Sequence, residues 1–228
     1  MREIVLDTET TGLDPKAGHR LVEVAGVELV NHVATGTHRR WYINPERDIP
    51  AEAQAVHGLT EEFLKNEPLF AAVAEDFLHF IGDATLVIHN AEFDLKFLNA
   101  ELARLGKPPL PSSRAVDTVA LARAKHPGAR VSLDALCQRY GIDNAHRTLH
   151  GALLDCELLA EVYLELRGGR EPGFGLALGS HAESESALEE ESAAREPRPP
   201  RPHAPSPEER EAHQAMLGRL TDPIWLDR

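Results

Sequence analysis

Apolar residues in the first 168 positions repeat with two spacings, one typical of strands and the other typical of helices. Short runs rich in Val, Ile and Leu predict strands over residues 2–8, 21–30, 37–43 and 85–89. Apolar positions three and four apart predict helices over residues 69–81, 92–105, 116–124, 132–140 and 151–166. Because strands come first and helices separate the later elements, the pattern indicates an α/β fold with a mixed sheet.

This pattern ends at Gly168 and Gly169. Of the 40 residues from 168 to 207, 30 are Gly, Pro, Ser, Ala or Glu. Such a segment buries too little apolar surface to offset the conformational entropy of the chain. We therefore expect a folded domain over residues 1–168 and a flexible linker over residues 169–205, with an ordered surface loop as the alternative.

A second ordered segment is predicted over residues 206–228. Ser206 as N-cap, Pro207 in the first helical position and Glu209 three residues after the serine form a helix-start signature. An isolated helix of this length is marginal in water. Because a long linker precedes it, we expect this tail to dock on another protein, with docking on the chain's own core as the alternative. The apolar side chains expected to make that contact are Met216, Leu220, Trp225 and Leu226.

Composition and charge narrow the possible functions. The net charge is −13, which excludes a protein that binds nucleic acid through phosphate neutralisation alone. Two cysteines, Cys137 and Cys156, are too few for a secreted disulfide scaffold or a zinc finger. No apolar run approaches the roughly 20 residues of a membrane span, and the N-terminal run is too short for a signal peptide. A soluble cytoplasmic protein is therefore expected.

Two carboxylates stand at the end of the most apolar predicted strand. Asp7 and Glu9 are two residues apart, so their side chains share one face, with Cα atoms roughly 7 Å apart. Like charges at that spacing repel unless a cation lies between them, and Mg²⁺ is typically held by carboxylate oxygens. On its own the pair is a weak signal, since acidic residues are also common at exposed strand ends.

Two further acidic residues and a histidine follow later in the chain. Asp94 falls in the first turn of a predicted helix, where the helix dipole alone would favour an anion. Asp155 lies in an apolar segment, where an unpaired carboxylate is costly. His150 is five residues earlier, about 140° around a continuous helix. We therefore expect His150 on the preceding loop, reaching the same cleft, with a surface or capping role as the alternative.

These residues lie in three segments that together resemble the motifs of the DEDDh exonucleases. The segments are Ile-Val-Leu-Asp-Thr-Glu-Thr-Thr-Gly at 4–12, His-Asn-Ala-Glu-Phe-Asp at 89–94 and His-Gly-Ala-Leu-Leu-Asp at 150–155. Residues 131–137 and 147–155 are similar, more specifically, to the epsilon proofreading subunits of bacterial DNA polymerase III. The resemblance covers residues 1–168.

The resemblance implies a ribonuclease H-like mixed sheet flanked by helices, and 3′→5′ exodeoxyribonuclease activity. It implies removal of mispaired 3′-terminal nucleotides as nucleoside 5′-monophosphates. Two Mg²⁺ or Mn²⁺ ions would clamp the reacting oxygens of an in-line displacement, and His150 would act as the general base. The residues implied as metal ligands are Asp7, Glu9, Asp94 and Asp155.

The resemblance also implies a set of contacts to the terminal nucleotide. Residues 51–59 are similar to the segment that closes over this nucleotide, and His57 has the alternative role of a helix-terminal residue before Gly58. The implied substrate-binding residues are Asp7, Thr8, Glu9, Thr10, Glu52, His57, Phe93 and Asp155.

The partners follow from the same resemblance: a single-stranded or frayed DNA 3′ end, and the catalytic alpha subunit of the polymerase, bound through the tail. In this family a sliding-clamp motif often begins with Gln shortly after the nuclease domain. The corresponding run at 170–176 has no Gln at its start, although Phe174, Leu176 and Leu178 could fill an apolar clamp pocket.

Two other functions fit the same fold. A stand-alone 3′→5′ exoribonuclease would use the same carboxylates and have no use for the tail. A catalytically silent scaffold subunit would not need the complete acidic set with His150, so the sequence favours the nuclease.

Overall fold

The computed structural model describes residues 1–147, 149–169 and 204–219. The chain divides after Gly175 into two units, which are described separately. Residues 170–203 lie outside the description, so the predicted linker and the domain limits at 168 and 205 stay predictions. Among the described residues, no helix combines the length and apolar character needed to cross a bilayer.

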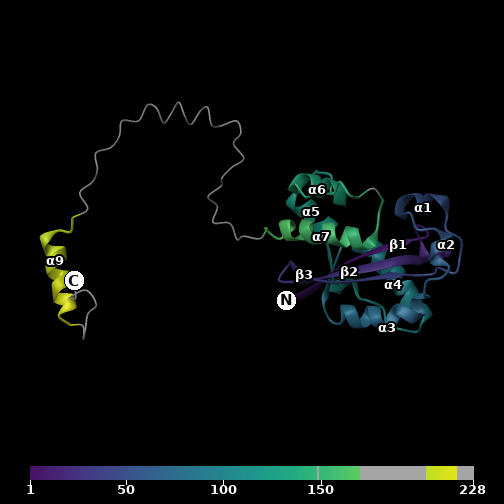
Figure 1. Ribbon diagram of the computed structural model, residues 1–228, viewed down its shortest axis with the longest axis horizontal. Helices are drawn as coiled ribbons and strands as arrows, with labels where there is room; N and C mark the ends of the chain where they lie inside the picture. The colour runs from purple at the N-terminus through teal and green to yellow at the C-terminus, as the bar shows by residue number, and fades with distance from the viewer. Residues whose placement is uncertain (148, 170–203, 220–228) are drawn as a thin grey trace, which may run out of the picture. The chain divides into compact units, whose positions relative to one another are not determined.

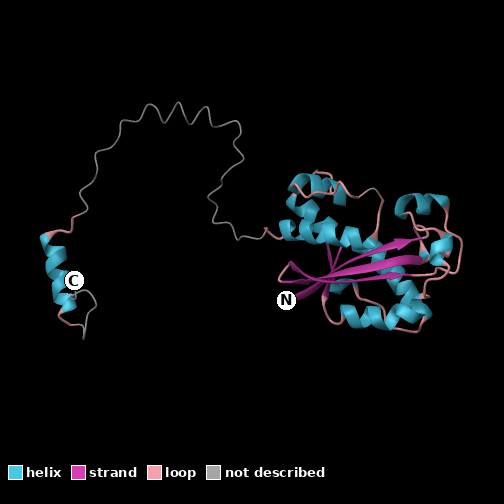
Figure 2. Ribbon diagram, in the orientation of Figure 1, coloured by secondary structure: helices cyan, strands magenta, loops and turns pink. Residues whose placement is uncertain are grey.

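The N-terminal unit is built on a five-stranded sheet (Figure 2) with the strand order β3-β2-β1-β4-β5. Strands β1, β2 and β3 are antiparallel neighbours, and β4 and β5 continue the sheet in parallel to β1. The mixed sheet predicted from the sequence is thereby confirmed. The strands are β1 (Arg2–Thr10), β2 (Leu21–Val30), β3 (Val33–Tyr42), β4 (Thr85–Ile88) and β5 (Ala115–Asp117).

Helices cover both faces of this sheet (Figure 1). One core joins α3 (Phe70–Ile81) and α4 (Ala91–Arg104) to the face that carries Ile4 and Leu6. The other core joins the remaining long helices to the face that carries Val5. These helices are α5 (Thr118–Lys125), α6 (Leu133–Tyr140) and α7 (Ala152–Leu166). Because both faces of β1 are covered, its run from Ile4 to Leu6 is fully buried.

The topology brings distant residues to one edge of the sheet. Strands β1 and β4 are parallel, so their carboxyl ends lie at the same edge, and α4 begins there directly after β4. Helix α7 packs across β1 and β2 from the other side. The first turns of α4 and α7 therefore both lie next to the end of β1.

The structure corrects the predicted elements in several places. The short helix α2 (Glu61–Leu64) has no counterpart in the sequence prediction, and α1 (Ala51–His57) is anticipated only through the alternative role of His57 as a helix-terminal residue. Strand β5 occupies the start of the helix predicted over 116–124, because Asp117 caps α5 and the helix begins only at Thr118. Strand β3 begins at Val33 rather than at residue 37. Single 3-10 turns occur at Pro15–Ala17 and Ser112–Arg114.

The C-terminal unit contains α9 (Pro207–Leu217). The predicted start is confirmed, since the Ser206 hydroxyl accepts from the Glu209 amide and the Glu209 carboxylate accepts from the Ser206 amide. No residue of α9 is buried, and Met216 is 50% exposed. The other predicted contact residues of the tail, Leu220, Trp225 and Leu226, lie outside the described residues.

Candidate active site

The site begins with the carboxylates at the end of β1. Asp7 and Glu9 alternate with Thr8 and Thr10, so they lie on the Val5 face of the sheet, toward α7. Glu9 is 8% exposed, and Asp7 is half-buried. The two side chains share a face, as their spacing predicts.

Asp94 reaches the same edge from the opposite helical layer. It lies in the first turn of α4, after Asn90, whose φ of +70° turns the chain sharply from β4 into the helix. The Thr8 hydroxyl donates a hydrogen bond of 2.8 Å to Asp94 Oδ1. Thr8, which we expected to contact the substrate, thus also orients a carboxylate.

Asp155 and His150 approach from α7. Asp155 is in the first turn of α7 and is 5% exposed. His150 precedes the helix on a loop, as the spacing predicts, and its side chain is 49% exposed. Its Nδ1 lies 3.4 Å from Asp155 Oδ2.

An arginine that the sequence analysis did not assign joins these residues. Arg147 donates from Nε to Asp155 Oδ1 at 2.6 Å and from Nη2 to Asp155 Oδ2 at 2.7 Å. It also donates to His150 Nδ1 at 2.9 Å and to Asp134 Oδ1 at 2.8 Å. These hydrogen bonds, foremost those to Asp155, raise the pKa of Arg147, so its guanidinium stays charged.

The carboxylates carry more negative charge than their surroundings balance. Burial, followed by the charges of Asp94, Glu9 and Asp155, raises the pKa of Asp7 well above its usual range. Burial raises the pKa of Glu9 to about 8, and Asp155 is the first of its charged neighbours to add to the shift. Burial also raises the pKa of Asp94 to about 7, against the Thr8 hydrogen bond. Bound cations are one way to relieve this excess.

The donor set fits a divalent metal. One ligand atom each from Glu9, His150 and Asp155 lie within 4.8 Å of one another. Carboxylate oxygens are the ligands that Mg²⁺ and Mn²⁺ prefer, and the burial of Glu9 and Asp155 limits competition from water. The residues present therefore fit a divalent cation.

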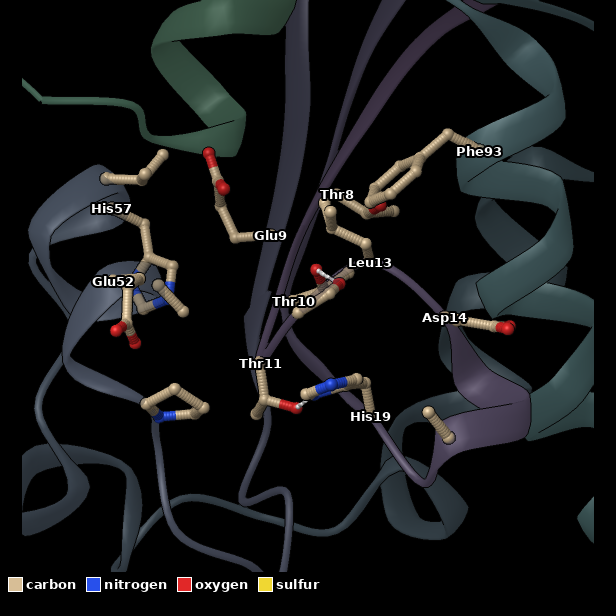
Figure 3. Close-up of a pocket in the computed structure, with 15 residues that line it drawn as sticks. Thr8, Glu9, Thr10, Thr11, Leu13, Asp14, His19, Glu52, His57 and Phe93 are labelled. Carbon is tan, nitrogen blue, oxygen red and sulfur yellow. Dashed lines mark hydrogen bonds between the residues drawn. The ribbon is translucent and has the colours of Figure 1, made fainter.

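A cavity of about 550 Å³ lies beside the carboxylates. Figure 3 shows Glu52 and His57 from α1 on one side of this cavity and Phe93 from α4 on the other, with Thr10 between them. The structure thereby brings together the expected contacts Thr8, Glu9, Thr10, Glu52, His57 and Phe93. Asp7 and Asp155 are not part of this lining.

His57 combines the two roles considered for it. It ends α1 before Gly58 and also lines the cavity. Its Nδ1 accepts the Leu59 amide at 3.0 Å, so a neutral ring carries its proton on Nε2. Burial lowers the pKa of His57 and favours that neutral form. The Thr10 backbone opposes this shift, but Nε2 is buried and makes no hydrogen bond of normal geometry among the described residues.

The loop that carries His150 is tied to α1. The His150 amide donates to the Val56 carbonyl at 2.9 Å. Gly58 has a φ of +73°, and a Cβ there would lie 2.7 Å from Leu149 Cδ1. A side chain at this position would therefore meet both backbone strain and the Leu149 side chain. Helix α1, which lines the cavity, therefore packs directly against the loop that carries His150.

Glu23 is a second residue that sequence reasoning missed. It is fully buried opposite Glu9 on β2. Its carboxylate accepts from Arg40 at 2.6 Å and from the Ala152 amide, the first of α7, at 3.3 Å. The one sequence feature that could have indicated Glu23 is an acidic residue within an otherwise apolar strand. Its position opposite Glu9 depends on the register between β1 and β2, which only the folded sheet shows.

The comparisons with known proteins agree with this geometry. The model of the family described as Exonuclease matches residues 4–163. DNA polymerase III subunit epsilon of Rickettsia prowazekii (strain Madrid E) is 58% identical over 177 residues, which cover 76% of this chain and 77% of the relative. The subunit of the same name from Escherichia coli (strain K12) is 49% identical, with coverage of 74% and 72%.

Solved structures give the same fold. Exonuclease X in complex with 5′ overhanging duplex DNA is 27% identical, with a TM-score of 0.56 and coverage of 72% of this chain and 89% of the other. The nuclease domain of 3′hExo, a DEDDh family member bound to rAMP, has a TM-score of 0.63 at 19% identity, with coverage of 73% and 91%. The chain belongs to the exonuclease family and, within it, to the epsilon subunits of DNA polymerase III.

Proposed function

We propose that this chain removes mispaired 3′-terminal nucleotides for DNA polymerase III, one nucleoside 5′-monophosphate at a time. The observation that carries the proposal is the meeting of Asp7, Glu9, Asp94 and Asp155 at the end of β1. These carboxylates, of which Glu9, Asp94 and Asp155 are buried, lie beside a cavity of about 550 Å³, a volume within the range of small-ligand sites. Family membership supplies the reaction class, and the site supplies the residues that would perform it.

The four carboxylates would hold two Mg²⁺ or Mn²⁺ ions, which supply Lewis-acid stabilisation of the phosphodiester and a reactive water. Thr8 keeps Asp94 in place for that task through its hydrogen bond of 2.8 Å. Glu23 fixes the first turn of α7 through the Ala152 amide and thereby positions Asp155.

His150 would accept the proton of the attacking water on a ring nitrogen. Its half-exposed ring stands on the loop before α7, next to Asp155, where it can reach solvent. That exposure lets the proton pass to bulk water after each turnover. A histidine is suited to this task because it accepts and releases protons near neutral pH.

The cavity residues would hold the terminal nucleotide. The Nε2–H of neutral His57 is a buried donor with no partner among the described residues, and a sugar or phosphate oxygen would satisfy it. The Phe93 ring offers a face on which a base can stack. None of these contacts distinguishes one base from another, so a mispaired end would be selected because it frays more easily.

The partners would be a frayed DNA 3′ end and the polymerase alpha subunit, bound through residues 206–228. A chain with a net charge of −13 gains little from general phosphate attraction. Attachment to the polymerase would replace that attraction with a high effective concentration of the primer end. The sliding clamp is a further candidate partner, through Phe174, Leu176 and Leu178.

The test is release of nucleoside monophosphates from a 3′-mismatched DNA primer in Mg²⁺. Asp7→Asn keeps the shape of the side chain but removes a metal-ligand charge, and we expect the rate to fall more than about 100-fold. Asp48→Asn, whose side chain is 81% exposed in the wild type, is the matched control and should keep full activity. Wild-type cleavage of RNA but not DNA would instead favour the exoribonuclease, and no cleavage of either would favour the scaffold.

A further inference from the structure

Arg147 lies among the candidate metal ligands, where a positive side chain competes with a bound cation. Among the described residues, it is the only Lys or Arg that hydrogen-bonds any of the four candidate metal ligands. Its side chain is 7% exposed, compared with 6% for Asp155. The positive charge of Arg147 also lowers the pKa of Glu9 against the effect of burial. The guanidinium is thus a cation inside an acidic cluster.

The guanidinium lies between two of the groups that could hold a metal. Arg147 Nη2 is 2.7 Å from Asp155 Oδ2 and 2.9 Å from His150 Nδ1. Asp155 and His150, with Glu9, also make up the set whose ligand atoms lie within 4.8 Å of one another. Because Arg147 takes both oxygens of Asp155, it uses the lone pairs that point most directly out of the carboxylate.

We propose that Arg147 is a positioning residue that takes the place of a divalent cation on Asp155 while it holds His150, and that it leaves both when the metal binds. The inference rests on the proposed function, since it concerns metal loading of the exonuclease site. It makes Arg147 a competitor of the metal in the free enzyme rather than a support for the metal ligand.

The contact between Arg147 and His150 links metal binding to the ability of His150 to accept a proton from water. Arg147 donates to Nδ1, so Nδ1 must be the acceptor and a neutral ring carries its proton on Nε2. Neither ring nitrogen then offers a free lone pair to water. When Arg147 leaves, Nδ1 becomes free and the ring can change tautomer. A site without metal would therefore hold its histidine inactive.

Asp134 offers Arg147 a partner away from the metal ligands. Arg147 Nη1 donates to Asp134 Oδ1 at 2.8 Å, and the Asp134 side chain is 58% exposed. Asn144 also donates to the same oxygen at 3.0 Å. An arginine released from Asp155 can keep its pairing with Asp134, so the exchange does not strand a buried charge.

The first experiment measures Mn²⁺ binding to the full chain by calorimetry. We expect Arg147→Gln to lower the Mn²⁺ Kd about tenfold, equivalent to about 1.4 kcal/mol, because the competing cation is gone. Arg147→Lys keeps the charge but cannot hold both Asp155 oxygens, so its Kd should fall between the two. Arg139→Gln is the matched control, since it removes the same charge from the exposed side of α6, where Arg139 makes no hydrogen bond with a candidate metal ligand or His150 among the described residues; its Kd should change less than about threefold.

A second measurement uses the wild type, so it does not depend on how the variants fold. The ¹⁵N resonances of His150 should report an Nε2–H tautomer without metal and change tautomer on titration with Mg²⁺. A Kd that stays constant or rises in Arg147→Gln, or a fall of equal size in Arg139→Gln, overturns the inference. So does a His150 tautomer that Mg²⁺ leaves unchanged. If these results hold but wild-type protein cleaves no primer, the proposed function fails and the exchange of Arg147 with metal stands.

Discussion

Replacement of Glu9 should stabilise the metal-free protein at high pH. Burial and the neighbouring carboxylates raise the pKa of Glu9 from 4.5 to about 8, so the folded state holds this proton more tightly than the unfolded chain does. The stabilisation is complete below about pH 4.5 and is lost as the pH rises through about 8. Above that pH the folded site carries an ionised Glu9 among other carboxylates.

The magnitude follows from the difference between the two pKa values. From 4.5 to about 8, at 1.36 kcal/mol per pKa unit, gives an upper limit of about 5 kcal/mol. Only the part between pH 6 and about 8 falls within the assay below, which sets a limit of about 3 kcal/mol there. Relaxation of the site and entry of water reduce this, so we expect about 1–2 kcal/mol. For a folded unit of this size that corresponds to a fall in Tm of roughly 3–6 °C.

The assay is thermal unfolding in EDTA at pH 6 and pH 9. Wild-type protein should lose this stability at pH 9 relative to pH 6. Glu9→Gln should lose less, by about the Glu9 contribution, because the glutamine cannot ionise whereas Asp7 and Asp94 still can. Glu161→Gln, on the exposed side of α7, is the control and should behave as wild type. Added Mg²⁺ should restore the wild type at pH 9. Equal losses for wild type and Glu9→Gln would refute the electrostatic argument.

Three further predictions test the supports of the site. Thr8→Val removes the hydroxyl that donates to Asp94, and Mn²⁺ titration of primer hydrolysis should show a metal requirement raised about 10–100-fold. Gly58→Ala places a Cβ against Leu149 at a φ of +73°; we expect a loss of about 1–3 kcal/mol in urea unfolding, and an unchanged midpoint would contradict the strain argument. Removal of residues 206–228 should leave cleavage of a free primer unchanged but abolish co-purification with the polymerase alpha subunit, whereas persistent co-purification would place the interface elsewhere.

The long helices and strands could be predicted because burial of one or both faces requires apolar residues at a regular spacing in the sequence. Strand β2 and the end of α3 lie where the apolar pattern places them, since each buries one or both faces against a core. Helices α1 and α2 contain seven and four residues, too few for an amphipathic repeat to emerge. Strand β5 has three residues and owes its conformation to pairing with β4 rather than to its own sequence.

The candidate metal ligands could be predicted from the sequence, whereas the residues that hydrogen-bond to them or to their helices could not. Asp7 and Glu9 could be paired from their spacing, because a strand fixes which side chains share a face. Arg147 gives no comparable signal, since its contacts depend on how the loop before α7 folds back onto Asp155. Glu23 depends on the register between β1 and β2. Contacts across a sheet or a loop have no fixed sequence spacing, so residues that act through them emerge only from the structure.

The acidic character of the chain is consistent with a nucleic-acid substrate once the charge is considered locally. Burial raises the pKa values of Asp7, Glu9 and Asp94, and repulsion from the other site carboxylates adds to the shifts of Asp7 and Glu9. The metal-free site therefore resists full ionisation. Protons, Arg147 and divalent cations can each reduce the same negative charge. Two divalent cations would balance the four carboxylates and let a phosphodiester approach, so metal loading would decide whether the site accepts DNA. The net charge of −13 disfavours binding elsewhere on the surface.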